Sequence, residues 1–385
     1  MPAGANQAAP WRTVTFDAVS LRVPSSWPVQ NLVLHPGICP LLDTHAVYLG
    51  LPGPDPACPS AAYGKTDAVQ LLPADPQSPD VMDARVPTVI GGRAARTNAD
   101  AAVTHTIVDV LPAAGVEVSL SYGSDPALAR QIESTITVGV AARPAVLPAG
   151  GPAASPTAQQ RLFSGRGFDA CAAPSAATMS KWLAAPYRAV GIYIGGLNRT
   201  CGQPNLTPGW ISRIQAMGWH YFPIYAGLQA PCSHGYGITF STKHAAAQGT
   251  ASAADAAAQA RYLKIPRATP VFYDMEPYRG CGTAVITFLN SWDRELHAKG
   301  YMAGAYWNLM DLGSLTRAAG RITEPDIINY AHWDGQATTK SSYMPARMWA
   351  RHQRIHQYLG GITRTWGHVT LDIDLDKLDL KLPGP

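Results

Sequence analysis

The segment Val271-Phe272-Tyr273-Asp274-Met275-Glu276-Pro277-Tyr278 decides the fold of the second half of this chain. It predicts an apolar β-strand that ends in two carboxylates and is stopped by Pro277. Because side chains alternate faces along a strand, Asp274 and Glu276 must point to the same side. Two acids in one small space raise one pKa and keep the other carboxyl ionised, which suits a general acid beside a charged partner. On the motif alone, acids that cap the next helix or meet arginines are an equal alternative.

A regular alternation of short apolar strands and longer segments surrounds this motif. Eight strands are expected, at residues 167–171, 189–195, 221–226, 270–276, 301–307, 327–333, 355–359 and 369–374. Helices are expected between them, for example at 251–263 and 283–299. The pattern predicts a closed, parallel (β/α)8 TIM-like barrel over residues 165–385. An open doubly wound sheet is the alternative, although no glycine-rich phosphate loop follows the first strand.

The first part of the chain has a different sequence pattern. Short β-rich runs separated by proline and glycine predict a small β-rich α+β or all-β domain over residues 1–142. Residues 143–164 carry prolines among alanines and glycines without periodicity, and predict a semi-rigid linker. His35, Asp43 and His45 are interpreted as polar loop residues.

Composition limits the class of protein and its partners. The 385 residues are 46% hydrophobic and 15% charged, with a net charge of +4, which is typical of a globular protein and not of one that binds nucleic acid. No apolar run approaches the roughly 20 residues that span a bilayer. The N-terminus as written has no signal peptide.

The six cysteines are even in number and lie mostly in loops, without zinc-binding spacing. We interpret them as disulfides of an exported protein whose signal has been removed, with free cytosolic thiols as the alternative. Cys39 and Cys58 pair with each other or reach into the second domain. The other four cysteines allow three pairings.

Acids gather at the expected strand ends, where barrels of this kind place their chemistry. Asp169 ends the first strand, Asp274 and Glu276 the fourth, and Asp374 the eighth together with Asp372 and Asp376. An EF-hand reading of the last three fails, because its sixth and twelfth positions hold Lys377 and Pro383. We predict no cofactor and no metal, with a metal site of another type as the alternative.

Aromatic and amide side chains accompany these acids. Flat sugar faces pack on aromatic rings and sugar hydroxyls bind amides, so we predict that substrate is held by Tyr193, Tyr225, Gln229, Trp307, Trp333 and Gln357. For any one aromatic, packing between a strand and a helix is the alternative.

The second domain resembles a bacterial glycoside-hydrolase-like barrel family, formerly of unknown function and related to the family 25 lysozymes. The resemblance rests on the segments 167–175, 191–196, 227–232, 273–276, 357–358 and 372–376. It implies that Glu276 is the general acid and Asp274 its partner. Asp169 then matches the first-strand aspartate and Asp374 the last-strand aspartate. The cysteine-bearing loops depart from those lysozymes, which affects the expected sugar preference.

Two functions follow as hypotheses. The first is a secreted or cell-envelope-associated glycosidase that hydrolyses a polysaccharide such as peptidoglycan by carboxylate acid/base catalysis. The second is a weak or inactive glycan-binding module that uses the same cleft. The sequence does not fix the oligomeric state.

Overall fold

The computed structural model describes residues 10–76, 78–139 and 160–384. These residues form two compact units. The first unit contains residues 10–38, 42–53 and 65–139. The second contains residues 160–384 together with two short segments from the N-terminal part, 39–41 and 54–64. Both short segments precede residue 142, where the sequence predicted the end of the first domain.

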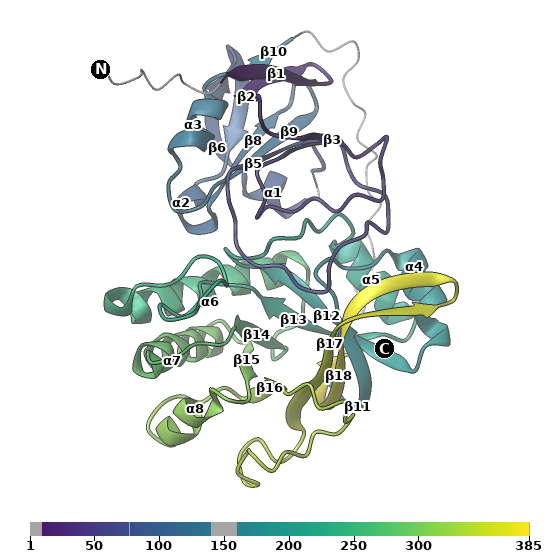
Figure 1. Cartoon of the computed structure of the whole chain (residues 1–385), viewed down its shortest axis with the longest axis vertical. Coiled ribbons are helices and arrows are strands. Elements are labelled where there is room, and N and C mark those ends of the chain that lie inside the picture. Colours follow the sequence, from purple (N-terminus) through teal and green to yellow (C-terminus); the bar gives the residue numbers. More distant parts are fainter. Residues whose placement is uncertain (1–9, 77, 140–159, 385) are drawn as a thin grey trace, which may run out of the picture. The chain divides into compact units, whose positions relative to one another are not determined.

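The first unit is built from two sheets (Figure 1). The smaller sheet has the strand order β1-β2-β10, with β2 in the centre. The larger sheet has the order β3-β4-β5-β9-β8-β7-β6, in which β9 pairs with β5 and β8. The strands are β1 Trp11–Phe16, β2 Val19–Pro24, β3 Val29–Asn31, β4 Val47–Leu49, β5 Ala68–Pro73, β6 Val86–Ile90, β7 Arg93–Thr97, β8 Thr106–Leu111, β9 Val116–Ser121 and β10 Thr137–Val138. Its short helices are α1 Pro79–Asp83, α2 Ala101–Thr104 and α3 Ala127–Glu133. Apolar residues from both sheets and α3 form one core.

The second unit is a closed barrel of eight strands that follow one another in chain order. They are β11 Gln160–Asp169, β12 Tyr187–Gly195, β13 His220–Tyr225, β14 Pro270–Met275, β15 Met302–Asn308, β16 Ile327–Ala331, β17 Gln353–Trp366 and β18 Val369–Pro383. Of the residues predicted to form a linker, those up to 159 lie outside the described part, and residues 160–164 belong to β11.

Helices follow the first five barrel strands and cover the outside of the barrel (Figure 1). They are α4 Ala176–Lys181, α5 Pro208–Ala216, α6 Ala245–Tyr262, α7 Gly282–Ala298 and α8 Leu312–Ala318, with short 3₁₀ turns at Trp182–Ala184 and Thr242–His244. The apolar face of α7 explains its position, since Phe288, Trp292 and Leu296 recur at helical spacing and are all buried.

The prediction of an all-parallel (β/α)8 barrel was wrong in its last strand. Pairs from β11–β12 to β16–β17 are parallel, whereas β18 runs antiparallel to both β17 and β11. The β17–β18 hairpin is the long yellow ribbon of Figure 1. It turns at Gly367 and His368, whose φ angles of 55° and 63° suit a two-residue hairpin loop. The second unit is therefore a closed barrel of mixed strand direction.

All six cysteines form disulfides, and all six lie in the second unit. The pairs are Cys39–Cys58, Cys171–Cys201 and Cys232–Cys281. The prediction of disulfides is confirmed, and one of the three pairings left open is selected. None of the described helices is long and apolar enough to cross a membrane.

Candidate active site

The end of β14 is fixed by one buried amide. The Gln229 side chain donates from Nε2 to the carbonyl of Asp274 at 2.7 Å and accepts from the amide N of Glu276 at 2.8 Å. Gln229 is fully buried. It therefore holds the backbone that carries both acids, and its amide is occupied by main-chain partners instead of facing a ligand.

Asp274 and Glu276 share the inner side of the barrel, as strand alternation predicted, and both are buried. Burial raises the pKa of Asp274 well above its usual range, and the neighbouring Glu276 raises it further. Burial also raises the pKa of Glu276 to about 7, although hydrogen bonds from Tyr63 and Asp274 oppose the rise. Because two adjacent buried carboxylates cannot both ionise readily, the pair retains a proton near neutral pH.

A second pair of acids lies where β11 meets β18. Asp169 stands directly opposite Asp374 in the register of these strands. The Nε2 of Gln357, on β17, donates to Asp169 at 3.3 Å and to Asp374 at 3.2 Å. The amide N of Gly361 adds a 2.7 Å bond to Asp374. One amide group thus ties the two carboxyl groups together.

The position of Asp374 has a different origin from the one predicted. Asp372, Asp374 and Asp376 were expected to close a parallel strand, but they lie in the first half of β18. Because β18 runs in the opposite direction, its early residues meet the carboxyl end of β11. Asp374 therefore reaches the same rim by an antiparallel route.

Asp376 is a further buried acid of this rim that was not among the predicted site residues. Both of its carboxylate oxygens and one oxygen of Asp169 have no hydrogen-bond donor. Burial raises the pKa of each of these two groups well above the usual range. A proton shared between the two acids would bridge Asp169 Oδ1 and one oxygen of Asp376.

Two buried tyrosines, Tyr193 on β12 and Tyr306 on β15, lie close to the carboxyl groups. Burial raises the pKa of Tyr193, and so do the charges of Asp274, Asp169 and Asp374. Burial also raises the pKa of Tyr306, and so do the charges of Glu276 and of the same three aspartates. The Tyr306 hydroxyl donates to Gln357 Oε1 at 3.0 Å. Tyr193 was among the residues predicted to hold substrate, and on β15 that prediction named Trp307.

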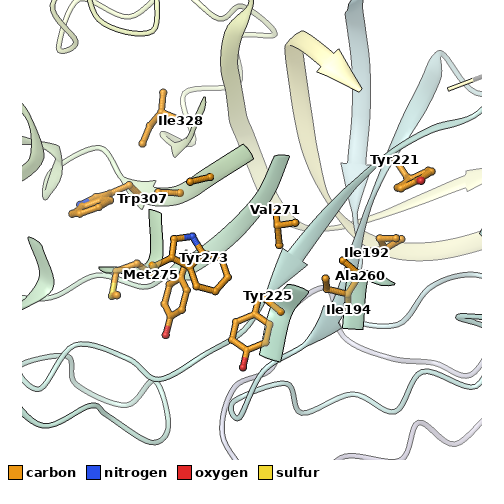
Figure 2. Close-up of a cluster of buried hydrophobic side chains, with 14 of the residues drawn as sticks. Ile192, Ile194, Tyr221, Tyr225, Ala260, Val271, Tyr273, Met275, Trp307 and Ile328 are labelled. Atoms are coloured by element: carbon orange, nitrogen blue, oxygen red, sulfur yellow. The ribbon is translucent and has the colours of Figure 1, made fainter. Parts of the chain in front are cut away.

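Tyr225 and Trp307 lie instead in the core between the strands and the outer helices. Figure 2 shows them with Tyr273 in one cluster of buried hydrophobic side chains. The Tyr225 hydroxyl donates to Asp255 of α6 at 2.7 Å, and its ring packs near Trp292 of α7. Strand alternation gives the reason, since the inward neighbours of these two residues are Ile224 and Tyr306.

Trp333 differs from the other predicted aromatics because it is 60% exposed. Its indole Nε1 donates to Gln357 Oε1 at 3.1 Å, so the ring is fixed next to the Asp169–Asp374 pair. An exposed, anchored aromatic ring is a suitable platform for a sugar face.

Two residues that reach the acids come from the segment 54–64 and were not predicted. The side chain of Tyr63 hydrogen-bonds with Asp274 and Glu276. The side chain of Ser60 hydrogen-bonds with Asp374. No spacing signal connects them to the barrel motifs, because both precede the linker in the sequence.

The family assignment follows from a match over the barrel. A family model described as the Rv2525c-like, glycoside hydrolase-like domain matches residues 180–378, more than half of the chain. The chain belongs to this family. The resemblance drawn from the sequence is confirmed at this level. Tyr63 and Asp169 precede the part of the chain that the Rv2525c-like model covers.

Several solved structures are similar to this Rv2525c-like chain at low sequence identity. An uncharacterised B. stearothermophilus protein is 19% identical with a TM-score of 0.39, over 56% of this chain and 95% of that chain. The Mycobacterium tuberculosis Tat-secreted protein Rv2525c, in complex with L-tartrate, is 14% identical with a TM-score of 0.40, over 56% and 96%. A GH18 chitinase from Pseudoalteromonas aurantia is 12% identical with a TM-score of 0.30, over 48% and 78%. No curated protein matches the chain.

Possible metal ligands gather twice among the described residues, in the groups Cys39, Cys58, Cys201 and His332, Asp334, His356. The cysteines of the first group are all in disulfides. In the second, the ring nitrogens of His356 lie 2.6 Å and 2.8 Å from the carbonyl oxygens of Thr338 and His332. A nitrogen that donates to a carbonyl offers no lone pair to an ion, so neither group is a ready metal site in the Rv2525c-like barrel.

Proposed function

We propose that the protein is an exported glycoside hydrolase that acts on a cell-envelope polysaccharide such as peptidoglycan. The observation that carries the proposal is the buried pair of Asp274 and Glu276 at the barrel rim, which retains a proton near neutral pH. Membership of a glycoside hydrolase-like family supports it. Three disulfides support export.

In this proposal each acid has a defined role. Glu276 protonates the glycosidic oxygen as the bond to the leaving sugar breaks. Asp274 stabilises the positive charge that develops at the anomeric carbon, or orients a substrate acetamido group that attacks there. Asp169 and Asp374, held together by Gln357, bind sugar hydroxyls on the opposite side, and Trp333 supplies an exposed ring.

The experiment measures release of reducing sugar from purified peptidoglycan and from several soluble glycans. We expect the wild-type protein to release sugar and Glu276→Gln to lose activity by about 100-fold or more, since the glutamine has no proton to give. Glu295→Gln is the matched control, because Glu295 lies on the outer helix α7 and pairs with Lys299. Equal activity of wild type and Glu276→Gln contradicts the assignment.

One observation favours a second candidate, a glycan-binding module without turnover. Asp169, Asp274, Glu276 and Asp374 are 1%, 2%, 6% and 5% exposed, and Ser60 and Tyr63 contact the rim acids from outside the barrel strands. In this candidate the segment stays in place, and Glu276 does not reach a glycosidic bond. Binding of peptidoglycan without release by either wild type or Glu276→Gln supports the module.

A further inference from the structure

The segment 54–64, which we call the strap, is anchored to the barrel unit at both ends. At its start, the carboxylate of Asp55 accepts from the amide N and the Oγ of Ser175 at 3.3 Å and 3.4 Å. At its end, the amide N of Gly64 donates to the carbonyl of Asn198 at 3.1 Å, and the Thr200 hydroxyl donates to the carbonyl of Gly64 at 2.8 Å. The strap is therefore a defined part of the barrel unit.

Its middle is fixed by covalent bonds. The disulfide Cys39–Cys58 joins the strap to the segment 39–41, and that segment pairs with the barrel through a bridge between Leu41 and Cys201. Cys201 is itself bonded to Cys171. Two neighbouring disulfides thus hold the strap against the loops that follow β11 and β12.

Close backbone packing then fixes the residue next to the end of the strap. Gly64 and Gly237 have φ angles of 98° and 86°, and a Cβ on Gly237 would lie 2.8 Å from the Cα of Gly64. Tyr63, the preceding residue, forms a backbone bridge with Arg199, and its ring meets Tyr236 edge-on at 5.9 Å. With backbone and ring both held, the hydroxyl has a set direction.

That direction is toward the acids of β14. Tyr63 lies close enough to Asp274 and Glu276 for its hydroxyl to lower the pKa of both, and Ser60 lowers the pKa of Asp374 in the same way. A hydroxyl has one hydrogen to donate, so it can stabilise one ionised carboxylate of the pair at a time. The carboxyl group that receives this hydrogen is the better anion, and its partner is the better place for the shared proton.

We propose that Tyr63 is a positioning residue of the carboxyl centre, whose hydroxyl, presented by the strap, determines how the Asp274–Glu276 pair shares its proton. The inference deepens the proposed function and rests on it for its catalytic meaning, because it concerns the same pair. The strap precedes residues 180–378, which the family model matches.

The other titratable groups around the pair are Asp169 and Asp374 and the hydroxyls of Tyr193, Tyr306 and Tyr236. Hydrogen bonding from Tyr63 favours the ionised forms of both Asp274 and Glu276. Its removal must therefore raise the pH at which the pair titrates. A purely structural role for Tyr63 does not predict this direction.

The test is a carboxyl ¹³C NMR titration of the full-length protein, without any glycan. In Tyr63→Phe we expect the Glu276 titration to move upward from about 7 by roughly one pH unit. Tyr236→Phe is the matched control, because it removes a hydroxyl from the ring that contacts Tyr63, and it should titrate as wild type. Ser60→Ala should raise the pKa of Asp374, because it removes the hydrogen bond from the Ser60 side chain.

A measurement on the unmodified protein covers the case in which Tyr63→Phe folds poorly. The ¹³Cζ signal of Tyr63 should shift with the same midpoint as Glu276 as the pair ionises. The proposal is overturned if Tyr63→Phe titrates as wild type does. It is also overturned if the Tyr63 signal does not change as the Asp274–Glu276 pair ionises. If wild type releases no sugar, the proposed function fails while these titrations still decide the role of Tyr63. If wild type does release sugar, the pH midpoint of the alkaline limb of kcat/KM should rise in Tyr63→Phe together with the titration of the Asp274–Glu276 pair.

Discussion

At the scale of single residues, Glu276 couples the site to protein stability. Its pKa is about 7 in the folded protein and 4.5 as an ordinary glutamate. As pH rises through this window, the unfolded chain loses the proton first, so the unfolded state gains stability relative to the folded state. The contribution of Glu276 to folding is therefore most favourable below about 4.5 and declines until about 7.

We expect Glu276→Gln to become more stable relative to wild type as pH rises from 4.5 to 7, by up to roughly 3 kcal/mol. The variant has no carboxyl group to ionise in the buried site. Urea unfolding at several pH values, followed by tryptophan fluorescence, measures the difference. Glu295→Gln should show no comparable trend, and a difference that shrinks with pH contradicts the burial assigned to Glu276.

Residue-level prediction from the sequence succeeded where one local rule was enough. Asp274 and Glu276 lie two apart on one strand, and alternation alone places them on one side. Tyr63 could not be found in this way, because its contact with them depends on a strap whose course is fixed by disulfides and backbone packing. The amide of Gln229 shows the same limit, since only the structure reveals its main-chain partners.

At the scale of elements, the packing of α6 on α7 depends on one glycine. A Cβ on Gly249 of α6 would collide with the backbone carbonyl of Phe288 in α7. Alanine normally favours a helix over glycine by about 1 kcal/mol, but only glycine leaves room here for the close approach of the two helices. The glycine therefore sets how closely the helices after β13 and β14 can pack.

We expect Gly249→Ala to destabilise the protein by roughly 1–3 kcal/mol, because the helices must separate. Gly209→Ala in α5 is the matched control, since the nearest atom to its added Cβ is Thr207 Oγ1 at 3.8 Å. That variant should be neutral or more stable by up to about 1 kcal/mol. Thermal unfolding of both variants makes the comparison, and equal stability contradicts the close approach.

Eight strands and the positions of α6 and α7 could be predicted from apolar periodicity. The direction of β18 was missed, although nine residues, 360–368, separate the two predicted strands, fewer than the dozen or so that a parallel crossover needs. Tyr225 and Trp307 were predicted to hold substrate because they are aromatic residues at strand ends. The side of the strand that each occupies was not considered, and both lie in the core.

At the scale of the whole molecule, the chain order and the structural units do not coincide. Segments 39–41 and 54–64 belong to the barrel unit, while the intervening residues 42–53 belong to the other unit. The chain therefore leaves and re-enters the barrel unit before the predicted linker. A cut at that linker separates the barrel strands from the strap, from Tyr63 and from the Cys39–Cys58 disulfide.

A chain that starts at residue 160 tests whether the barrel strands form a complete unit. It retains all eight strands and two disulfides, Cys171–Cys201 and Cys232–Cys281. We expect it to unfold at a lower urea concentration than the full-length protein, because the loops after β11 and β12 lose the strap that covers them. The same fragment should bind glycan more readily, since Ser60 and Tyr63 no longer contact the rim acids.

Tryptophan fluorescence can follow this unfolding, because eight of the ten tryptophans lie beyond residue 160. The full-length protein with Tyr63→Phe separates the two effects of the strap, since it loses one hydroxyl and keeps the disulfide and the backbone contacts. If the fragment and the full-length protein unfold at the same urea concentration, the strap contributes nothing to the barrel. A strap that stabilises the barrel and also restricts glycan access links the fold of the first half of the chain to the chemistry of the second.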